Sequence, residues 1–110
     1  MTDEEFEEHV RAALDSLPDD IAGSLENVAV VVEEESAESS AILGSFIGYP
    51  RGLGTPSGAL PAKVVVYRRP LLASFPKPAE LERQIRITVL HEVAHYFGID
   101  EARIDELGYG

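Results

Sequence analysis

The chain contains no cysteine and no tryptophan, and it has a single methionine. Without cysteine it can form neither a disulfide nor a thiolate ligand to a metal, which agrees with a reducing compartment. Basic residues are also scarce, since 9 lysines and arginines face 20 aspartates and glutamates, for a formal net charge of −11. This balance argues against a nucleic-acid partner, because contacts between basic side chains and phosphates dominate such binding.

Long apolar runs are missing as well. No stretch approaches the roughly 18 apolar residues that a membrane-spanning helix needs, and the acidic start Met1–Glu5 is the opposite of a positively charged signal peptide. A length of 110 residues suits one domain. We therefore expect a single domain over residues 1–110, located in the cytoplasm, with no membrane partner.

Hydrophobic periodicity predicts both helices and strands along the chain. Thr2 and Glu5 form a capping-box pattern, which predicts an N-terminal helix over Asp3–Leu17. The continuous apolar run Val28–Val32 favours an interior strand that is covered on both faces. The other expected elements are a short connection over Ile21–Ser24, strands over Leu25–Val32, Ala41–Tyr49 and Ala62–Arg69, a flap or plain connector over Pro50–Pro61, a helical turn or loop over Leu71–Phe75, the long helix over Pro78–Phe97 and a short helix over Glu101–Leu107.

The long helix carries a polar stripe on an otherwise apolar surface. Its apolar residues recur every four positions, which indicates a mostly buried helix: Leu81, Ile85, Val89, Val93 and Phe97. The polar stripe consists of Gln84, Thr88, His91 and His95. A buried helix with one polar stripe needs a reason for that stripe.

The reason that the sequence suggests is a metal ion. His91, Glu92 and His95 form a His-Glu-x-x-His pattern, which would arise by chance roughly 0.007 times in shuffled chains of this composition. Residues at i and i+4 of a helix lie one above the other, so both imidazoles can bind one zinc ion. Glu92 then lies where its carboxylate can take a proton from an ion-bound water, which is the metallopeptidase interpretation of the pattern.

A third ligand is expected just after the helix. Gly98 suits the left-handed position that ends a helix and turns the chain back toward the histidines. The carboxylates of Asp100, Glu101 and Asp105 follow, and spacing alone leaves all three open. We expect one zinc ion per chain, which crystals can lack at low pH because protonated ligands bind it weakly.

Several segments together resemble the small bacterial zincin-like metallopeptidases, or minimal zincins. They are Leu43–Pro50, Leu60–Leu71, His91–Ile99 and Glu106–Gly108, within a resemblance that covers about Leu25 to Gly108. The resemblance implies an α+β zincin fold, in which a small mixed sheet packs on the long helix. It also implies zinc on His91 and His95, and Glu92 as general base. The acidic place of the family motif falls on Glu101, which is one methylene longer than the aspartate usual there. We therefore expect Glu101 as the third ligand, with Asp105 as the first alternative and Asp100 as the second. The absence of a histidine at this place and of any later methionine separates the chain from the metzincins.

The expected function is hydrolysis of peptides or unstructured protein segments by a metal-activated water. Candidates to stabilise the oxyanion are Tyr67, Tyr96, Arg103 and Tyr109, and the sequence does not choose among them. The alternative is a non-catalytic metal-binding or protein-interaction module on a zincin scaffold. Only the short segment Ile99–Gly110 follows Gly98, so we expect an open cleft with one wall, a sheet edge at Ala62–Arg69, which a partner protein or second subunit would complete.

Overall fold

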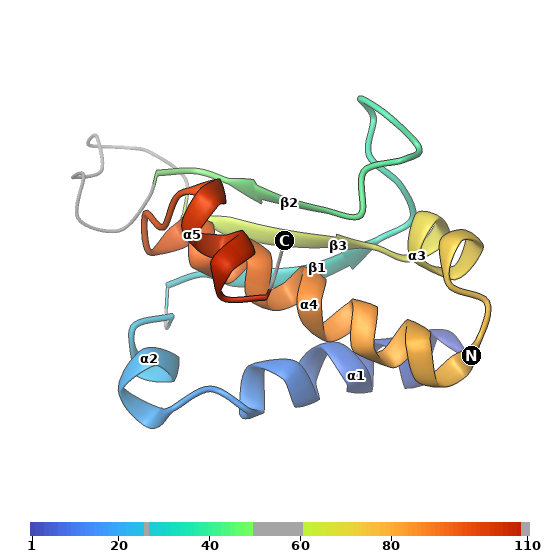
Figure 1. Ribbon diagram of the computed structural model, residues 1–110, viewed down its shortest axis with the longest axis horizontal. Helices are drawn as coiled ribbons and strands as arrows, with labels where there is room; N and C mark the ends of the chain where they lie inside the picture. The colour runs from blue at the N-terminus through green and yellow to red at the C-terminus, as the bar shows by residue number, and fades with distance from the viewer. Residues whose placement is uncertain (26, 50–60, 109–110) are drawn as a thin grey trace.

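The structure is a computed structural model, and it describes residues 1–25, 27–49 and 61–108 (Figure 1). These residues contain three strands and five helices. In chain order they are α1 (Asp3–Asp15), α2 (Asp19–Gly23), β1 (Ala29–Glu33), β2 (Gly44–Ile47), β3 (Lys63–Tyr67), α3 (Arg68–Ser74), α4 (Pro78–Tyr96) and α5 (Glu101–Glu106). The predicted α+β class is thus confirmed. None of these helices is both long enough and apolar enough to cross a membrane.

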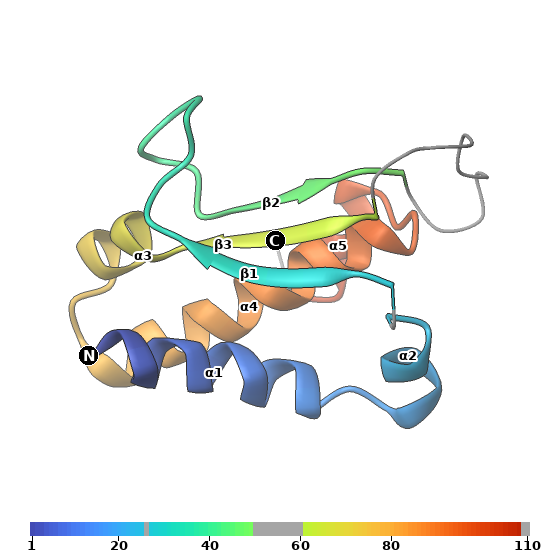
Figure 2. The ribbon, with the colours of Figure 1, turned by 180° about the vertical axis from the view of Figure 1, so that it is seen from behind.

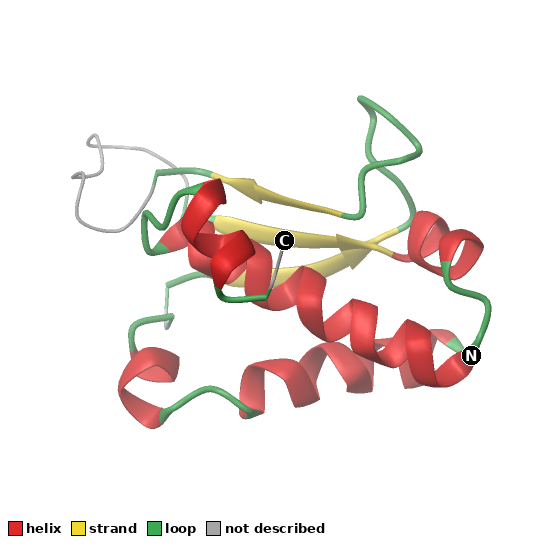
Figure 3. Cartoon of the chain, in the orientation of Figure 1, coloured by secondary structure: helices red, strands yellow, loops and turns green. Residues whose placement is uncertain are grey.

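The sheet is small and mixed, as expected. Its strand order is β1-β3-β2, with β1 parallel to β3 and β2 antiparallel to β3. Val65 lies in the middle of β3, opposite Val31 of β1 on one side and Ser45 of β2 on the other. Helix α4 crosses one face of the sheet and α1 packs against α4, as Figures 2 and 3 show from opposite sides.

The core lies between α1, α4 and the sheet. Each helix and strand directs apolar side chains toward this space, at the spacing of its own type. Each fully buried large apolar side chain contributes roughly 1.5–3 kcal/mol to the free energy of unfolding. The buried cluster contains Phe6, Val10 and Ala13 of α1, Val66 of β3, Leu71 of α3, and Leu81, Ile85, Val89 and Val93 of α4. The four-residue repeat of the long helix is therefore confirmed as its core-facing side, and it fixes the rotation of α4 about its axis.

The N-terminal helix begins as the sequence predicts. The Glu5 amide donates to Thr2 Oγ1 at 3.1 Å, and the Thr2 amide donates to the Glu5 carboxylate at 3.0 Å, which completes the capping box. The helix ends at Asp15, two residues before the predicted end. The connection expected at Ile21–Ser24 is instead occupied mostly by the short helix α2, which follows Pro18.

The predicted places of two strands in the sheet were wrong. Ala62–Arg69 was expected to offer an open edge, but its strand, β3, is central and pairs on both sides. The Val28–Val32 run was expected inside the sheet, but its strand, β1, lies at an edge and is only half-buried. An apolar run indicates that a strand is at least partly buried, but it does not indicate the position of that strand in the sheet. The order of the strands depends on contacts between segments that are distant in the chain.

The segment after β3 turns into a helix earlier than expected. The third strand was predicted to reach Arg69, but α3 begins at Arg68, and Pro70 fits in its first turn, where a missing amide costs little. Arg68 and Arg69 both donate to the Glu34 carboxylate at 3.0–3.1 Å, so these arginines pair with a surface acid. The loop predicted over Pro50–Pro61 falls, except for Pro61, outside the described residues.

Candidate metal centre

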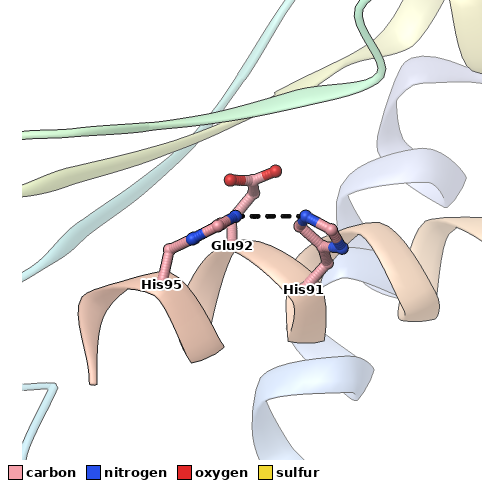
Figure 4. A group of neighbouring side chains, drawn as sticks. All are labelled: His91, Glu92 and His95. Atoms are coloured by element: carbon pink, nitrogen blue, oxygen red, sulfur yellow. Dashed lines mark hydrogen bonds between the residues drawn. The ribbon is translucent and has the colours of Figure 1, made fainter. Parts of the chain in front are cut away.

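The polar stripe of α4 brings two histidines and a glutamate together. Their ligand atoms all lie within 4.8 Å of one another, and Figure 4 shows both imidazoles and the Glu92 carboxylate rising from the same stretch of helix. The Nε2 atoms of His91 and His95 are 3.2 Å apart. The side chains of both histidines are about three-quarters buried, with 22% and 29% of their surfaces exposed.

A carboxylate from α5 joins the two rings. Glu101 Oε1 lies 2.7 Å from His95 Nε2 and 3.5 Å from His91 Nε2. Two donor atoms bound to one tetrahedral zinc ion at 2.0–2.1 Å lie about 3.3–3.4 Å apart. The three separations of 3.2, 2.7 and 3.5 Å lie around this value, and two imidazoles with one carboxylate are a donor set that zinc accepts. The residues present therefore fit a zinc ion.

The turn that delivers Glu101 has a clear local cause. Gly98 has φ 75°, the Gly98 amide donates to the His95 carbonyl, and the Ile99 amide donates to the Ala94 carbonyl. This is the Schellman arrangement that commonly ends a helix at a glycine. The chain reverses there, and Glu101 becomes the first residue of α5 beside the histidines.

The other two candidate carboxylates have different surroundings. Asp100 caps α5, because its Oδ1 accepts a hydrogen bond from the Arg103 amide at 2.9 Å. Asp105 is exposed near the end of the same short helix. Of the three candidates that the spacing left open, the structure thus brings Glu101 into contact with both rings.

Glu92 is the buried acid of the centre. Only 8% of its surface is exposed. Burial raises the pKa of Glu92 above its ordinary value, and the negative charge of Glu101 raises it further, while His91 and His95 oppose this shift. A carboxyl group whose pKa is raised toward neutrality is suited to accepting and returning a proton.

Strand β2 closes over this acid, which the sequence did not predict. A Cβ atom added at Gly44 would lie 3.2 Å from Cγ of Glu92 and 2.7 Å from Cγ2 of Thr88. The strand can approach α4 so closely because Gly44 has no side chain. A glycine inside an apolar strand is a known sign of such an approach, but the sequence does not say which element approaches.

A hollow of about 260 Å³ adjoins the centre between β2 and α4. Its lining residues are Leu43, Gly44, Gln84, Ile87, Thr88, His91 and Glu92. Three of the four residues in the predicted polar stripe thus line this space. The stripe has two uses: one end holds the histidine pair, and the other forms a partly polar recess beside it.

The three described candidates for oxyanion stabilisation lie on three different elements, β3, α4 and α5. Tyr96 is half-buried beside His95, and its ring contacts that of Phe46 with centroids 6.0 Å apart. Tyr67 is buried in β3, with 5% of its surface exposed. Arg103 donates to the Glu106 carboxylate at 2.9 Å, and Tyr109 lies outside the described residues.

The third histidine lies away from this centre. His9 is on α1, and its Nδ1 is 3.8 Å from the Glu82 carboxylate near the start of α4. It is half-buried where the two helices meet. His9 therefore belongs to the contact between α1 and α4 and not to the metal centre.

Comparison with known families agrees with the geometry. The sequence model of one family, described as zincin-like metallopeptidase, matches residues 25–110. The chain belongs to the zincin-like metallopeptidases. The match covers the segments that carry the resemblance in the sequence, and it leaves out α1. Membership in the family implies a zinc ion, for which His91, Glu92 and His95 form a candidate group.

The fold of this zincin-like protein also occurs in a solved structure. A conserved hypothetical protein from Thermo thermophilus is similar, with a TM-score of 0.60 and 23% sequence identity, and the match covers 97% of each chain. At this identity the likeness concerns the fold alone. No curated protein matches the chain.

Proposed function

We propose that this protein is a zinc-dependent peptidase that cleaves peptide bonds in unstructured segments. The observation that carries the proposal is the convergence of three zinc-type donor atoms, at separations of 2.7–3.5 Å, beside a buried glutamate. Membership in a metallopeptidase family supports it. We expect one zinc ion per chain, held by His91, His95 and Glu101.

Glu92 is assigned as the general base and not as a fourth ligand. Its oxygen can approach both histidines within 4.8 Å, a range that includes ligands as well as groups standing behind a bound water. The closer contacts belong to Glu101, which leaves Glu92 free for the water. A purely structural zinc site would close with four protein ligands, whereas a catalytic site keeps one position open.

Each part of the centre has its own role in the proposed reaction. When bound, zinc lowers the pKa of a water to about 7 and polarises a carbonyl oxygen. With zinc held by His91, His95 and Glu101, the Glu92 carboxylate would accept a proton from the attacking water and return it to the leaving amine. Gly44 lies close to the Glu92 side chain, of which only a small part of the surface is exposed, and the Glu101 contact holds the two imidazoles in place.

The substrate is proposed to lie along β2 and not along the central strand. Strand β2 occupies an edge of the sheet and passes over Glu92, so an extended peptide that pairs with it would cross the centre. Ile47, at the end of this strand, is 51% exposed and can contact a substrate side chain. This corrects the expectation that Ala62–Arg69 forms the wall of the cleft.

A comparison of Glu92→Gln with the wild-type protein tests the function. The variant should keep its zinc and its fold but lose peptide hydrolysis by at least the 10²–10⁴-fold that general-base catalysis contributes. Glu82→Gln is the matched control, because it removes the same charge from the same helix at an exposed position beside α1. Equal cleavage by Glu92→Gln and wild type would contradict the mechanism. Stoichiometric zinc with no hydrolysis in any of the three proteins would favour the non-catalytic metal-binding module.

A further inference from the structure

A groove runs along the edge of the sheet that lies farthest from the metal centre. One wall is β1 and the other is the side of α1 that faces β1. The groove has a volume of about 460 Å³. Figure 2 shows the two elements side by side with opposite chain directions. We call this groove the β1 slot; it is lined by Glu7, Val10, Arg11 and Leu14 of α1 and by Val30, Val31 and Val32 of β1.

The β1 wall presents backbone groups that no described strand uses. The Ala29 amide donates to the Ala62 carbonyl, so Ala29 points its backbone groups toward β3. In a parallel pair alternate residues point the same way, so Val31 faces β3, and Val30 and Val32 turn their N–H and C=O groups to the slot. Among the described strands β1 pairs with β3 alone. Unpaired N–H and C=O groups along a sheet edge can form hydrogen bonds with another strand.

The apolar character of β1 makes this edge unusual. Exposed edges are commonly protected by proline, by inward-pointing charges, by a bulge or by a covering helix or loop. Helix α1 borders this edge but leaves the groove between the two elements. Between Ala29 and Glu33 this strand has only valine, and its pairing with β3 is regular. The composition is that of a strand with a neighbour on each side, which is why the sequence alone favoured an interior position.

From these observations we infer that the β1 slot binds an extended segment of another protein, which adds to β1 as a fourth strand. Because helix α1 borders the slot, we expect a single strand to occupy it, whereas the sheet edge of a second copy would bring its own α1 into the same place. Recognition between an edge strand and a helix is a known mode of peptide binding, with main-chain bonds giving affinity and side-chain contacts giving selectivity.

The charges on the helix wall define the chemistry of the segment. Glu7 and Arg11 are exposed, and no ion pair involves either of them in the described ranges. Because α1 and β1 run in opposite directions, Glu7 lies toward the Glu33 end of the slot and Arg11 toward the Ala29 end. The expected segment therefore has one basic residue beside Glu7 and one acidic residue beside Arg11. Its other residues are short and apolar.

Two synthetic peptides of identical composition test the inference: acetyl-Thr-Val-Lys-Val-Asp-Val-Thr-amide and acetyl-Thr-Val-Asp-Val-Lys-Val-Thr-amide. Their charged residues are two positions apart, because two residues of a strand span about 6.6 Å and four residues of a helix span about 6 Å. Each is titrated by NMR into zinc-loaded Glu92→Gln protein, so that hydrolysis at the metal centre does not interfere. The peptide that binds should slow hydrogen exchange at the Val30 and Val32 amides at least about tenfold. The Val31 amide is an internal control, because β3 already protects it.

The charge swap Glu7→Arg with Arg11→Glu is the decisive variant. It keeps the net charge of −11 and changes only exposed positions of α1, so the fold is retained. One peptide should bind the original protein at least about threefold more tightly than the other, as two exposed ion pairs allow, and the swap should invert this preference. Val32→Pro, which removes one outward N–H at an edge position where proline is tolerated, should weaken binding at least about fivefold.

Three results would overturn the inference. One is that neither peptide changes exchange at Val30 and Val32 at saturating concentration. Another is that both peptides bind equally well in both proteins. The third is that binding perturbs only the amides of Gly44–Ile47, which would place the peptide on β2. That outcome would agree with the proposed substrate position while contradicting the β1 slot, so the two proposals fail separately.

Discussion

At the scale of single residues, Gly44 decides how closely β2 approaches α4. A methyl group at this position would lie 2.7 Å from Thr88 Cγ2, which is closer than packed atoms allow. Gly44→Ala should therefore lower the free energy of unfolding by about 1–3 kcal/mol, the usual cost of overpacking. The displacement of β2 should also expose Glu92 and reduce hydrolysis.

A second substitution makes this prediction specific. Thr88→Ser removes Cγ2 but keeps the hydroxyl that donates to the Gln84 carbonyl at 2.8 Å. The double variant Gly44→Ala, Thr88→Ser should recover much of the lost stability in urea unfolding. Gly23→Ala is the control, because nothing lies within 4 Å of the new methyl group. If Thr88→Ser gives no recovery, the contact with Thr88 is not the source of the cost.

Glu101 provides a second test at this scale. Glu101→Ala should weaken zinc affinity at least about tenfold, since loss of even an outer-shell partner costs about 10–100-fold. Asp105→Ala, on the same short helix, should change the affinity little. Competition with a chromophoric chelator measures both. The reverse ranking would move the third ligand to Asp105.

At the scale of elements, the turn between α4 and α5 links stability to metal affinity. Gly98 has φ 75°, a conformation that costs an L-residue roughly 1–2 kcal/mol. Gly98→Ala should lower stability by about that amount, and it should also weaken zinc binding because α5 carries Glu101. Gly108 has φ 89° and follows α5, so Gly108→Ala should strain the chain without affecting zinc. Equal zinc affinity in Gly98→Ala and wild type would show that the turn does not position the ligand.

The same elements show how far the sequence predicts this fold. The capping box at Thr2, the apolar repeat of α4 and the glycine turn at Gly98 are local signals, and each predicted its element correctly. Strand order was not predictable, because the run Val28–Val32 carries no information about its neighbours. For the same reason the proximity of Gly44 to Glu92 emerged only from the structure.

The residues of the candidate site also differ in how far the sequence predicts them, depending on whether they are close together in the chain. His91, Glu92 and His95 follow from helical spacing, since one element positions all three. Glu101 was one of three open candidates, because the direction of α5 after the turn depends on packing. The recess between β2 and α4 joins segments that are far apart in the chain, and nothing in the sequence relates them.

At the scale of the whole molecule, the proposed cleft has one wall. Strand β2 forms it, and α5 is the only described element after Gly98. Few contacts are then available to orient a peptide bond for attack, so we predict slow and weakly selective cleavage of unstructured peptides. A peptide-library assay on verified monomer, with Glu92→Gln as the blank, measures this. A kcat/KM above about 10⁴ M⁻¹s⁻¹, the low end for ordinary enzymes, would show that the chain forms a complete cleft alone.

The turn at Gly98 has a consequence for the order in which the protein assembles. His91, His95 and Glu101 belong to one short segment, so they can meet as soon as that segment forms its helix and turn, before the sheet exists. The cover over Glu92 comes from Gly44 and needs the sheet in place. Under the proposed function, we therefore expect zinc uptake and completion of the catalytic site to be separate events during maturation. A misassembled chain could carry its full complement of zinc and still be inert, so metal content alone is a poor assay of correct folding.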